Sequence, residues 1–291
     1  MIVTLNDKTM NKTGAKKHTA IIFILLFAMG VLTVGYSILP ARYPVRAEMT
    51  EIRTAIAENG RIVHAGGFIQ TEDGETVRYT NSYDALVNMY EQGNRVCEID
   101  IRETGDGVLI CAHGDDYYLA DGTDLPIDAS RDEFLTGKLF GSLQPMDVQM
   151  LAEFMREHKD LLVITDVRGN NVEICRKLAR EYPDLRNRFI IQIYHKEEYE
   201  PVRGTGFPYM IYTLYRAEDQ ERNLWEISRF ARDHELVGVT IQKEQFYNWK
   251  NRIAMNHCGV PYMFHTVNDA AEIRQMLSKP FVLGIYTDLT G

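Results

Sequence analysis

The feature that most constrains the fold is a regular alternation of short apolar, β-branched runs with helical stretches, starting near residue 61. The runs predict eight strands: Arg61–His64, Val96–Ile101, Leu161–Val167, Phe189–Tyr194, Tyr209–Thr213, Val237–Gln242, Tyr262–Val267 and Val282–Thr287. The predicted helices between them are Ser82–Gln92, Asn171–Glu181, Ala217–His234, Gln245–His257 and Asp269–Ser278. Two further crossovers have a less clear pattern. Eight strands joined mainly by helices over roughly 230 residues predict an α/β fold, a (β/α)8 TIM-like barrel. A doubly wound sheet also fits the alternation, although it usually has fewer strands.

Two segments depart from the barrel rhythm. Val108–His113 is an additional strand-like run outside the set of eight. Only four residues follow the eighth strand in the sequence, so no eighth helix is expected after it. A short helix over Thr50–Asn59, ending at Gly60, is predicted to cover the resulting gap.

The N-terminal region contains a long uncharged run. Ala20–Leu39 spans 20 residues, enough at about 1.5 Å per residue to cross about 30 Å of hydrocarbon. The lysines before it are Lys8, Lys12, Lys16 and Lys17, opposed only by Asp7. This bias predicts that the run is an uncleaved transmembrane helix with its N-terminal side in the cytoplasm. A cleaved signal peptide is the alternative, because Val45-Arg46-Ala47 resembles a cleavage site.

These features divide the chain into four parts. We expect a cytoplasmic tail over residues 1–19, a signal anchor over 20–39, a spacer with a short helix over 40–60, and the barrel over 61–291. The protein is thus predicted to be a single-pass cell-membrane protein with its barrel domain outside the cytoplasm. Lys and Arg number 32 against 41 Asp and Glu, a net charge of -9, which argues against a nucleic-acid partner. The four cysteines show no zinc-site spacing and are too few for a disulfide scaffold.

Two acids and two histidines carry the chemical signal. Glu98 and Asp100 are two residues apart in a central strand and therefore face the same side, toward the barrel interior. Adjacent buried carboxylates repel each other unless a cation lies between them. His64 and His113 each end a strand-like run, near the end of the barrel where active sites of this fold lie. The four residues suit general acid and base catalysis around a metal-bound anion.

Gln192 is a polar residue within a strand that should be buried on both faces. It is expected to point into the barrel, where it either touches a ligand or the ligating carboxylates, or makes a structural hydrogen bond.

The order of motifs resembles that of the glycerophosphodiester phosphodiesterase family, which shares its barrel with phosphatidylinositol phospholipase C. The segments that carry the resemblance are His64-Ala65-Gly66, Thr80-Asn81-Ser82, Glu98-Ile99-Asp100, Thr104-Gly105-Asp106-Gly107, His113-Gly114, Thr266-Val267-Asn268 and Gly284-Ile285-Tyr286-Thr287-Asp288. The likeness runs from Arg61 to Asp288 and is densest between the two histidines.

The resemblance implies roles for individual residues. It implies that Glu98 and Asp100 bind a divalent cation, calcium or magnesium, and that His64 and His113 are the acid/base pair. The family has a third carboxylate in a Glu-x-Lys pattern, and this chain has Asp166-Val167-Arg168 there. Asp166 would complete the metal site through a shorter side chain, and Arg168 would replace the lysine as a phosphate clamp.

The resemblance also implies which residues contact the substrate, although three positions differ from the family pattern. Asn81 and His265 are expected to contact substrate, together with Gln192 and Arg168. Ala65 stands where the family has an arginine, Gly114 where it has an aspartate, and His265 where it has a tryptophan. The implied activity is metal-dependent hydrolysis of glycerophosphodiesters or related lipid head-group or envelope phosphodiesters, with no prediction of oligomeric state. The alternatives are a metal-independent lyase of the phospholipase C type and a non-catalytic ligand-binding barrel.

Overall fold

The computed structural model describes residues 21–27, 29, 45–113, 128–216 and 223–290. Eight parallel strands form its centre: β1 (Arg61–His64), β4 (Val96–Glu103), β6 (Leu162–Val167), β7 (Phe189–Ile193), β8 (Met210–Thr213), β9 (Gly238–Gln242), β10 (Tyr262–His265) and β11 (Val282–Thr287). β1 pairs with both β11 and β4, which closes the sheet into a barrel. The eight predicted strands and the TIM-like barrel are therefore confirmed.

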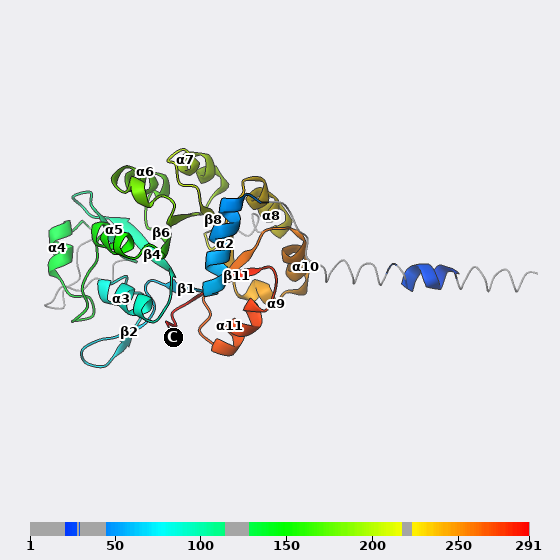
Figure 1. The fold of residues 1–291 in the computed structure, drawn as a ribbon, viewed down its shortest axis with the longest axis horizontal. Helices are drawn as coiled ribbons and strands as arrows, with labels where there is room; N and C mark the ends of the chain where they lie inside the picture. The colour runs from blue at the N-terminus through cyan, green and yellow to red at the C-terminus, as the bar shows by residue number, and fades with distance from the viewer. Residues whose placement is uncertain (1–20, 28, 30–44, 114–127, 217–222, 291) are drawn as a thin grey trace, which may run out of the picture.

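Helices surround this barrel (Figure 1). They are α3 (Tyr83–Glu91), α5 (Val148–Glu157), α6 (Asn171–Glu181), α7 (Tyr199–Arg203), α8 (Leu224–Asp233), α10 (Trp249–His257) and α11 (Ala270–Leu277), with the short α4 (Arg131–Thr136) and α9 (Glu244–Tyr247). Of the remaining strands, β5 (Leu109–Cys111) runs antiparallel to β4, and β2 (Ile69–Gln70) pairs with β3 (Thr76–Val77). The extra strand predicted after the second barrel strand is β5.

Alternation along each barrel strand sorts side chains between two environments. On β4, Cys97, Ile99 and Ile101 belong to the large apolar cluster shared with the outer helices. The intervening residues Glu98 and Asp100 point the other way, because successive side chains of a strand lie on opposite faces. Both are buried, so they lie inside the barrel as the sequence predicted.

Helix α2 (Ala47–Asn59) closes the N-terminal end of the barrel. Its buried residues Met49, Ile52 and Ile56 share one cluster with inward residues of nearly every strand. A helix on the outer surface could not reach all of those strands. The helix packs on β11 and β1, the two strands at the predicted gap, but it does so across the end of the barrel and not on its outer surface. It also begins three residues earlier than predicted, so the spacer is shorter.

Two predicted helices differ from the structure. The segment Gln245–His257 is divided into α9 and α10, because Asn248 has extended backbone and its side chain accepts a hydrogen bond from the amide of Lys250, which starts a new helix. α8 begins at Leu224, and residues 217–222 of the predicted helix lie outside the described residues. The two unclear crossovers are α5 and the short helices around α7.

Only part of the predicted membrane segment is described. Residues 21–27 are helical, and position 29 is the one other described residue of the segment 20–39. Among the described residues, no helix has both the length and the apolar character needed to cross a bilayer.

Candidate active site

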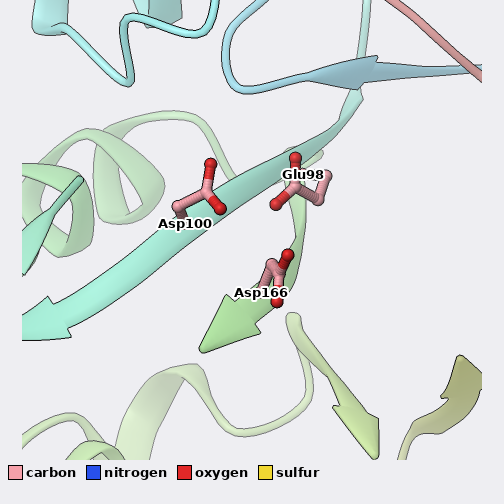
Figure 2. Close-up of side chains that lie close together, drawn as sticks. All are labelled: Glu98, Asp100 and Asp166. Carbon is pink, nitrogen blue, oxygen red and sulfur yellow. The ribbon is translucent and has the colours of Figure 1, made fainter. Parts of the chain in front are cut away.

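Three carboxylates converge at the C-terminal end of the barrel. Glu98 and Asp100 project from β4 and Asp166 from the neighbouring β6, where Asp100 and Asp166 are register partners. One oxygen of each residue lies within 4.8 Å of the others, and all three side chains are buried. Figure 2 shows the three carboxylates directed toward a common space between the two strands. The structure therefore brings together the three acids that the sequence predicted as metal ligands.

The cluster is under electrostatic strain. Burial, and then the neighbouring Asp100 and Asp166, raise the pKa of Glu98 well above its ordinary value. Burial and Asp166 also raise the pKa of Asp100. Glu98 Oε2 accepts a hydrogen bond from the amide of Ala65 at 3.1 Å, whereas the buried Oε1 has no partner among the described residues. An unpaired buried oxygen beside two further carboxylates fits a hard divalent cation, which prefers oxygen ligands.

His64, the last residue of β1, lies beside the cluster in a fixed orientation. Its Nδ1 is 3.2 Å from Asp288 Oδ1, and its Nε2 is 3.7 Å from Glu98 Oε2. Asp288 in turn accepts a hydrogen bond from Asn268 at 2.7 Å. Burial acts to raise the pKa of Asp288, but the hydrogen bonds from His64 and Asn268 hold it below its ordinary value. A carboxylate on Nδ1 leaves Nε2 directed at the site, the arrangement found in hydrolases that use an oriented histidine.

His113 contacts the same aromatic ring as His64, that of Tyr79. The ring centroid of Tyr79 is 4.4 Å from that of His64 and 5.7 Å from that of His113, both in edge-on geometry. Tyr79 has a positive φ of 58° and is 42% exposed, so it lies at the surface of the site. The two predicted catalytic histidines thus lie at one end of the barrel and both contact the same exposed phenol ring.

Arg168 and Asn81 both hold Asp100. The guanidinium of Arg168 donates to Asp100 Oδ1 at 3.1 and 3.2 Å and lies 3.5 Å from Asp166. Asn81 donates to Asp100 Oδ2 and accepts from the Asp100 amide, each at 3.0 Å. Asn81 is fully buried. The structure therefore places Asn81 behind the acid cluster, where it orients Asp100, and places Arg168 at its edge with a third of its side chain exposed.

Asp166 is held by two tyrosines that the sequence analysis missed. Tyr194 donates to its Oδ1 and accepts from the amide of Val167 at 2.7 Å. Tyr215 lies 2.7 and 2.8 Å from the two carboxylate oxygens. Arg216 stacks on Tyr194, with its guanidinium carbon 3.9 Å from the ring centroid, and approaches Asp166 to 3.5 Å. Each carboxylate oxygen has two lone pairs, so these contacts leave Asp166 able to share an oxygen with a cation.

Gln192 and His265 lie in the barrel without contacting the acids directly. Gln192 is buried and accepts a hydrogen bond from Thr213, which is the structural alternative that the sequence left open. His265 ends β10, and its Nε2 is buried with no hydrogen-bond partner among the described residues. Burial, with a contribution from His64, lowers the pKa of His265. A neutral His265 with an unsatisfied ring nitrogen is suited to face a polar ligand.

Some of the missed residues carried a sequence signal. Asp288 stands in the segment Gly284–Asp288 that supported the family resemblance, and its position just after the last strand places it at the site end. Tyr194 and Tyr215 had no such signal, because an aromatic residue at a strand end is usually part of the core.

Comparison with solved structures supports the fold. No family model matches the sequence, and no curated protein matches it. Among solved structures, a putative glycerophosphoryl diester phosphodiesterase from Silicibacter pomeroyi DSS-3 superposes with a TM-score of 0.60 at 15% identity, over 79% of this chain and 90% of that one. A glycerophosphodiester phosphodiesterase from Parabacteroides distasonis ATCC 8503 gives 0.57 at 19% identity, over 79% and 94%.

A third match contains a product. The Oleispira antarctica phosphodiesterase, in complex with the product sn-glycerol-3-phosphate, gives a TM-score of 0.57 at 16% identity, over 78% of this chain and 92% of that one. At these identities the likeness establishes the fold, which is the barrel that the sequence resemblance implied.

Proposed function

We propose that this protein is a metal-dependent phosphoric diester hydrolase that acts on glycerol-type phosphodiesters. The observation that carries the proposal is the buried cluster of Glu98, Asp100 and Asp166, with Glu98 Oε1 lacking a partner among the described residues, next to an oriented His64. Three buried carboxylates this close together, two of which (Glu98 and Asp100) have raised pKa values, are unfavourable in a protein that has no cation to place between them. The barrel shared with known phosphodiesterases supports the same assignment.

The three carboxylates would hold the cation, calcium or magnesium. A bound divalent cation would supply positive charge for the non-bridging oxygens of a phosphodiester. Asn81 keeps Asp100 in place through two hydrogen bonds, and the two tyrosines do the same for Asp166. These contacts fix the ligand set before any substrate arrives, which is what a site of defined geometry requires.

The histidines would move the protons. With Nδ1 directed at Asp288, His64 presents Nε2 to the substrate side, where it can take a proton from the attacking hydroxyl or give one to the leaving alcohol. His113, which also contacts Tyr79, would perform the complementary transfer. Arg168, partly exposed beside Asp100, would bind a phosphate oxygen, and the neutral His265 would face the alcohol part of the substrate.

The substrate class follows from the site and from one relative. The Oleispira antarctica structure holds sn-glycerol-3-phosphate as product, and we propose a diester that releases glycerol phosphate or a close analogue here. We also propose that the chain is membrane-anchored through residues 20–39, with the barrel of residues 61–291 outside the cytoplasm. The support is the uncharged run of 20 residues and the lysines before it. An anchored enzyme would meet lipid head-group or envelope diesters.

The test uses the full-length chain, purified in detergent and stripped of metal with a chelator. Release of alcohol from a glycerophosphodiester and from an aryl phosphodiester is measured with calcium, with magnesium and with neither. We expect turnover only with added cation, and its loss in Glu98→Gln. Glu103→Gln is the matched control, because Glu103 lies on the same strand but pairs with Lys177 outside the cluster.

Two outcomes of this test would favour the alternative functions. Activity that persists with chelator would support the metal-independent lyase. A folded protein that binds calcium but turns over neither diester would support a ligand-binding barrel.

A further inference from the structure

Three exposed aromatic residues on the barrel indicate which of its sides would face a membrane. Trp225 on α8, Tyr247 on α9 and Trp249 on α10 are 51%, 53% and 66% exposed. We call these three residues the aromatic patch. Tryptophan side chains are normally among the most buried of a domain, and here both tryptophans of the chain are at least half exposed. Tryptophan and tyrosine are the residues enriched where a protein meets the interface of a bilayer.

The patch lies at the same end of the barrel as the candidate active site. α8 follows β8, and α9 and α10 follow β9, so each of these helices begins near the C-terminal ends of the strands. Trp225 is the second residue of α8, Trp249 is the first of α10, and Tyr247 is the last of α9. α8 and α10 are in contact, and Figure 1 shows them on one side of the barrel. The patch therefore forms one section of the active-site rim.

The point where the chain enters the domain lies on the same side. Arg46 Nε is 2.7 Å from Glu235 Oε2, just after the C-terminal end of α8. α8 has 10 residues, so its two ends are about 15 Å apart. The apolar run ends at Leu39, and the six residues 40–45 can extend at most about 20 Å. The chain can therefore connect an anchor within the bilayer to an aromatic patch that rests on the bilayer surface, provided that α8 lies parallel to the membrane.

Basic side chains accompany the patch. Arg229, one turn after Trp225, is exposed, as are Lys250 and Arg252 beside Trp249. The Lys250 ammonium is 5.7 Å from the centre of the Trp249 ring. Glu226 and Glu244 are the exposed acids nearest in sequence. Over residues 223–252, which hold the patch, five basic residues stand against four acidic ones, so this stretch is repelled less by anionic head groups than the rest of a chain of net charge -9.

We propose that the aromatic patch docks on the interface of the anionic bilayer that holds the anchor. Docking there turns the side of the barrel to the membrane and puts one edge of the active-site opening at head-group level. This inference depends on the proposed anchor but not on the proposed catalytic activity.

The two tryptophans make the test direct. The full-length chain is reconstituted in vesicles of phosphatidylglycerol and phosphatidylcholine, with or without bromine on the acyl chains close to the head groups. Because the chain holds no other tryptophan, emission comes from the patch. We expect a loss of tryptophan emission in the brominated vesicles, and a smaller loss in each of Trp225→Phe and Trp249→Phe.

A control variant reports the other side of the molecule. Phe140 is 39% exposed and follows α4, which lies across the barrel from α10 in Figure 1. Phe140→Trp, made together with Trp225→Phe and Trp249→Phe, is expected to keep its emission in brominated vesicles. Equal emission of the native chain in both kinds of vesicle would overturn the docking surface. A chain that fails to float with the vesicles would overturn it together with the anchor, and hydrolase activity enters neither readout.

Discussion

The two ends of the barrel are built from the same strands but serve different purposes. On β1 the inward residue Ile62 belongs to the apolar cluster with α2, and two residues later His64 faces the acid cluster. On β6 the inward Ile164 is followed in the same way by Asp166. The change from apolar to polar occurs within one alternation of the strand. Burial of apolar side chains stabilises the N-terminal end, whereas the C-terminal end contains buried charges that cost stability.

Stability and chemistry can therefore be changed separately in this barrel. A substitution at the closed end should alter the free energy of unfolding and leave turnover per folded molecule intact. A substitution at the open end should lower turnover without lowering the free energy of unfolding. Enzymes commonly keep a site that is unfavourable for stability and compensate elsewhere.

The largest effect is expected from His64→Gln. Loss of a general acid or base lowers turnover by about 10²- to 10⁴-fold, while the melting temperature should change little because His64 is not part of the apolar cluster. Turnover of the chosen diester and thermal unfolding are measured on the same samples. His195→Gln is the matched control, since His195 follows β7 and is exposed. Near-native turnover in His64→Gln would remove this residue from the mechanism.

The opposite result is expected from Ile56→Ala in α2. Ile56 is fully buried in the cluster that closes the N-terminal end, and truncation of a buried isoleucine costs about 2–5 kcal/mol. Urea unfolding gives the change in free energy, and turnover is normalised to the folded fraction. Glu58→Ala, on the exposed face of the same helix, should change neither. An unchanged free energy of unfolding in Ile56→Ala would show that α2 does not close the barrel.

The fold could be predicted from the sequence because it depends on periodicity. The eight strands follow from short apolar runs, which directly record burial on both faces. The position of α2 could not be predicted, because its apolar spacing shows that one face is buried but not against which surface. The division at Asn248 was missed for a related reason, since the apolar spacing continues through the break and only the side-chain cap reveals it.

The candidate site also contains some residues that the sequence predicts and others that it does not. The acids were found because two carboxylates at alternate positions in a buried strand are unusual. Asp166 was found only through the family resemblance. Gln192 was expected inside the barrel. The partner of its hydrogen bond, Thr213, could not be foreseen because it lies on another strand. Tyr194 and Tyr215 were missed because their hydroxyl groups meet Asp166 only after the barrel has closed.

A smaller effect is expected from Tyr215→Phe, which removes one hydrogen bond from Asp166 and leaves the ring in place. Loss of a partner that orients a metal ligand typically weakens metal affinity by about 10- to 100-fold. Calorimetric titration of the metal-free chain with calcium measures the dissociation constant. Tyr182→Phe, a half-buried tyrosine at the end of α6, is the control and should bind calcium normally. Unchanged affinity in Tyr215→Phe would mean that Asp166 is positioned without this phenol.

The smallest effect concerns pH at the open end. Burial and the neighbouring acids raise the pKa values of Glu98 and Asp100 in the metal-free protein. The folded chain then retains protons that the unfolded chain has lost, so its stability falls as the pH rises above the ordinary carboxyl pKa of about 4. Calcium competes with these protons, so the stabilisation that it provides should grow with pH.

At ten times its dissociation constant measured at pH 8, calcium should add about 1.4 kcal/mol to the free energy of unfolding, and this increment should shrink toward zero as the pH falls to 5. Denaturant melts with and without calcium across this range measure it. The variant Glu98→Gln/Asp100→Asn should show no calcium increment at any pH, because its side chains no longer ionise. A calcium increment that stays constant across the range in the native chain would mean that the cation binds away from these two carboxylates, and the open end would then lose its assignment as the metal site.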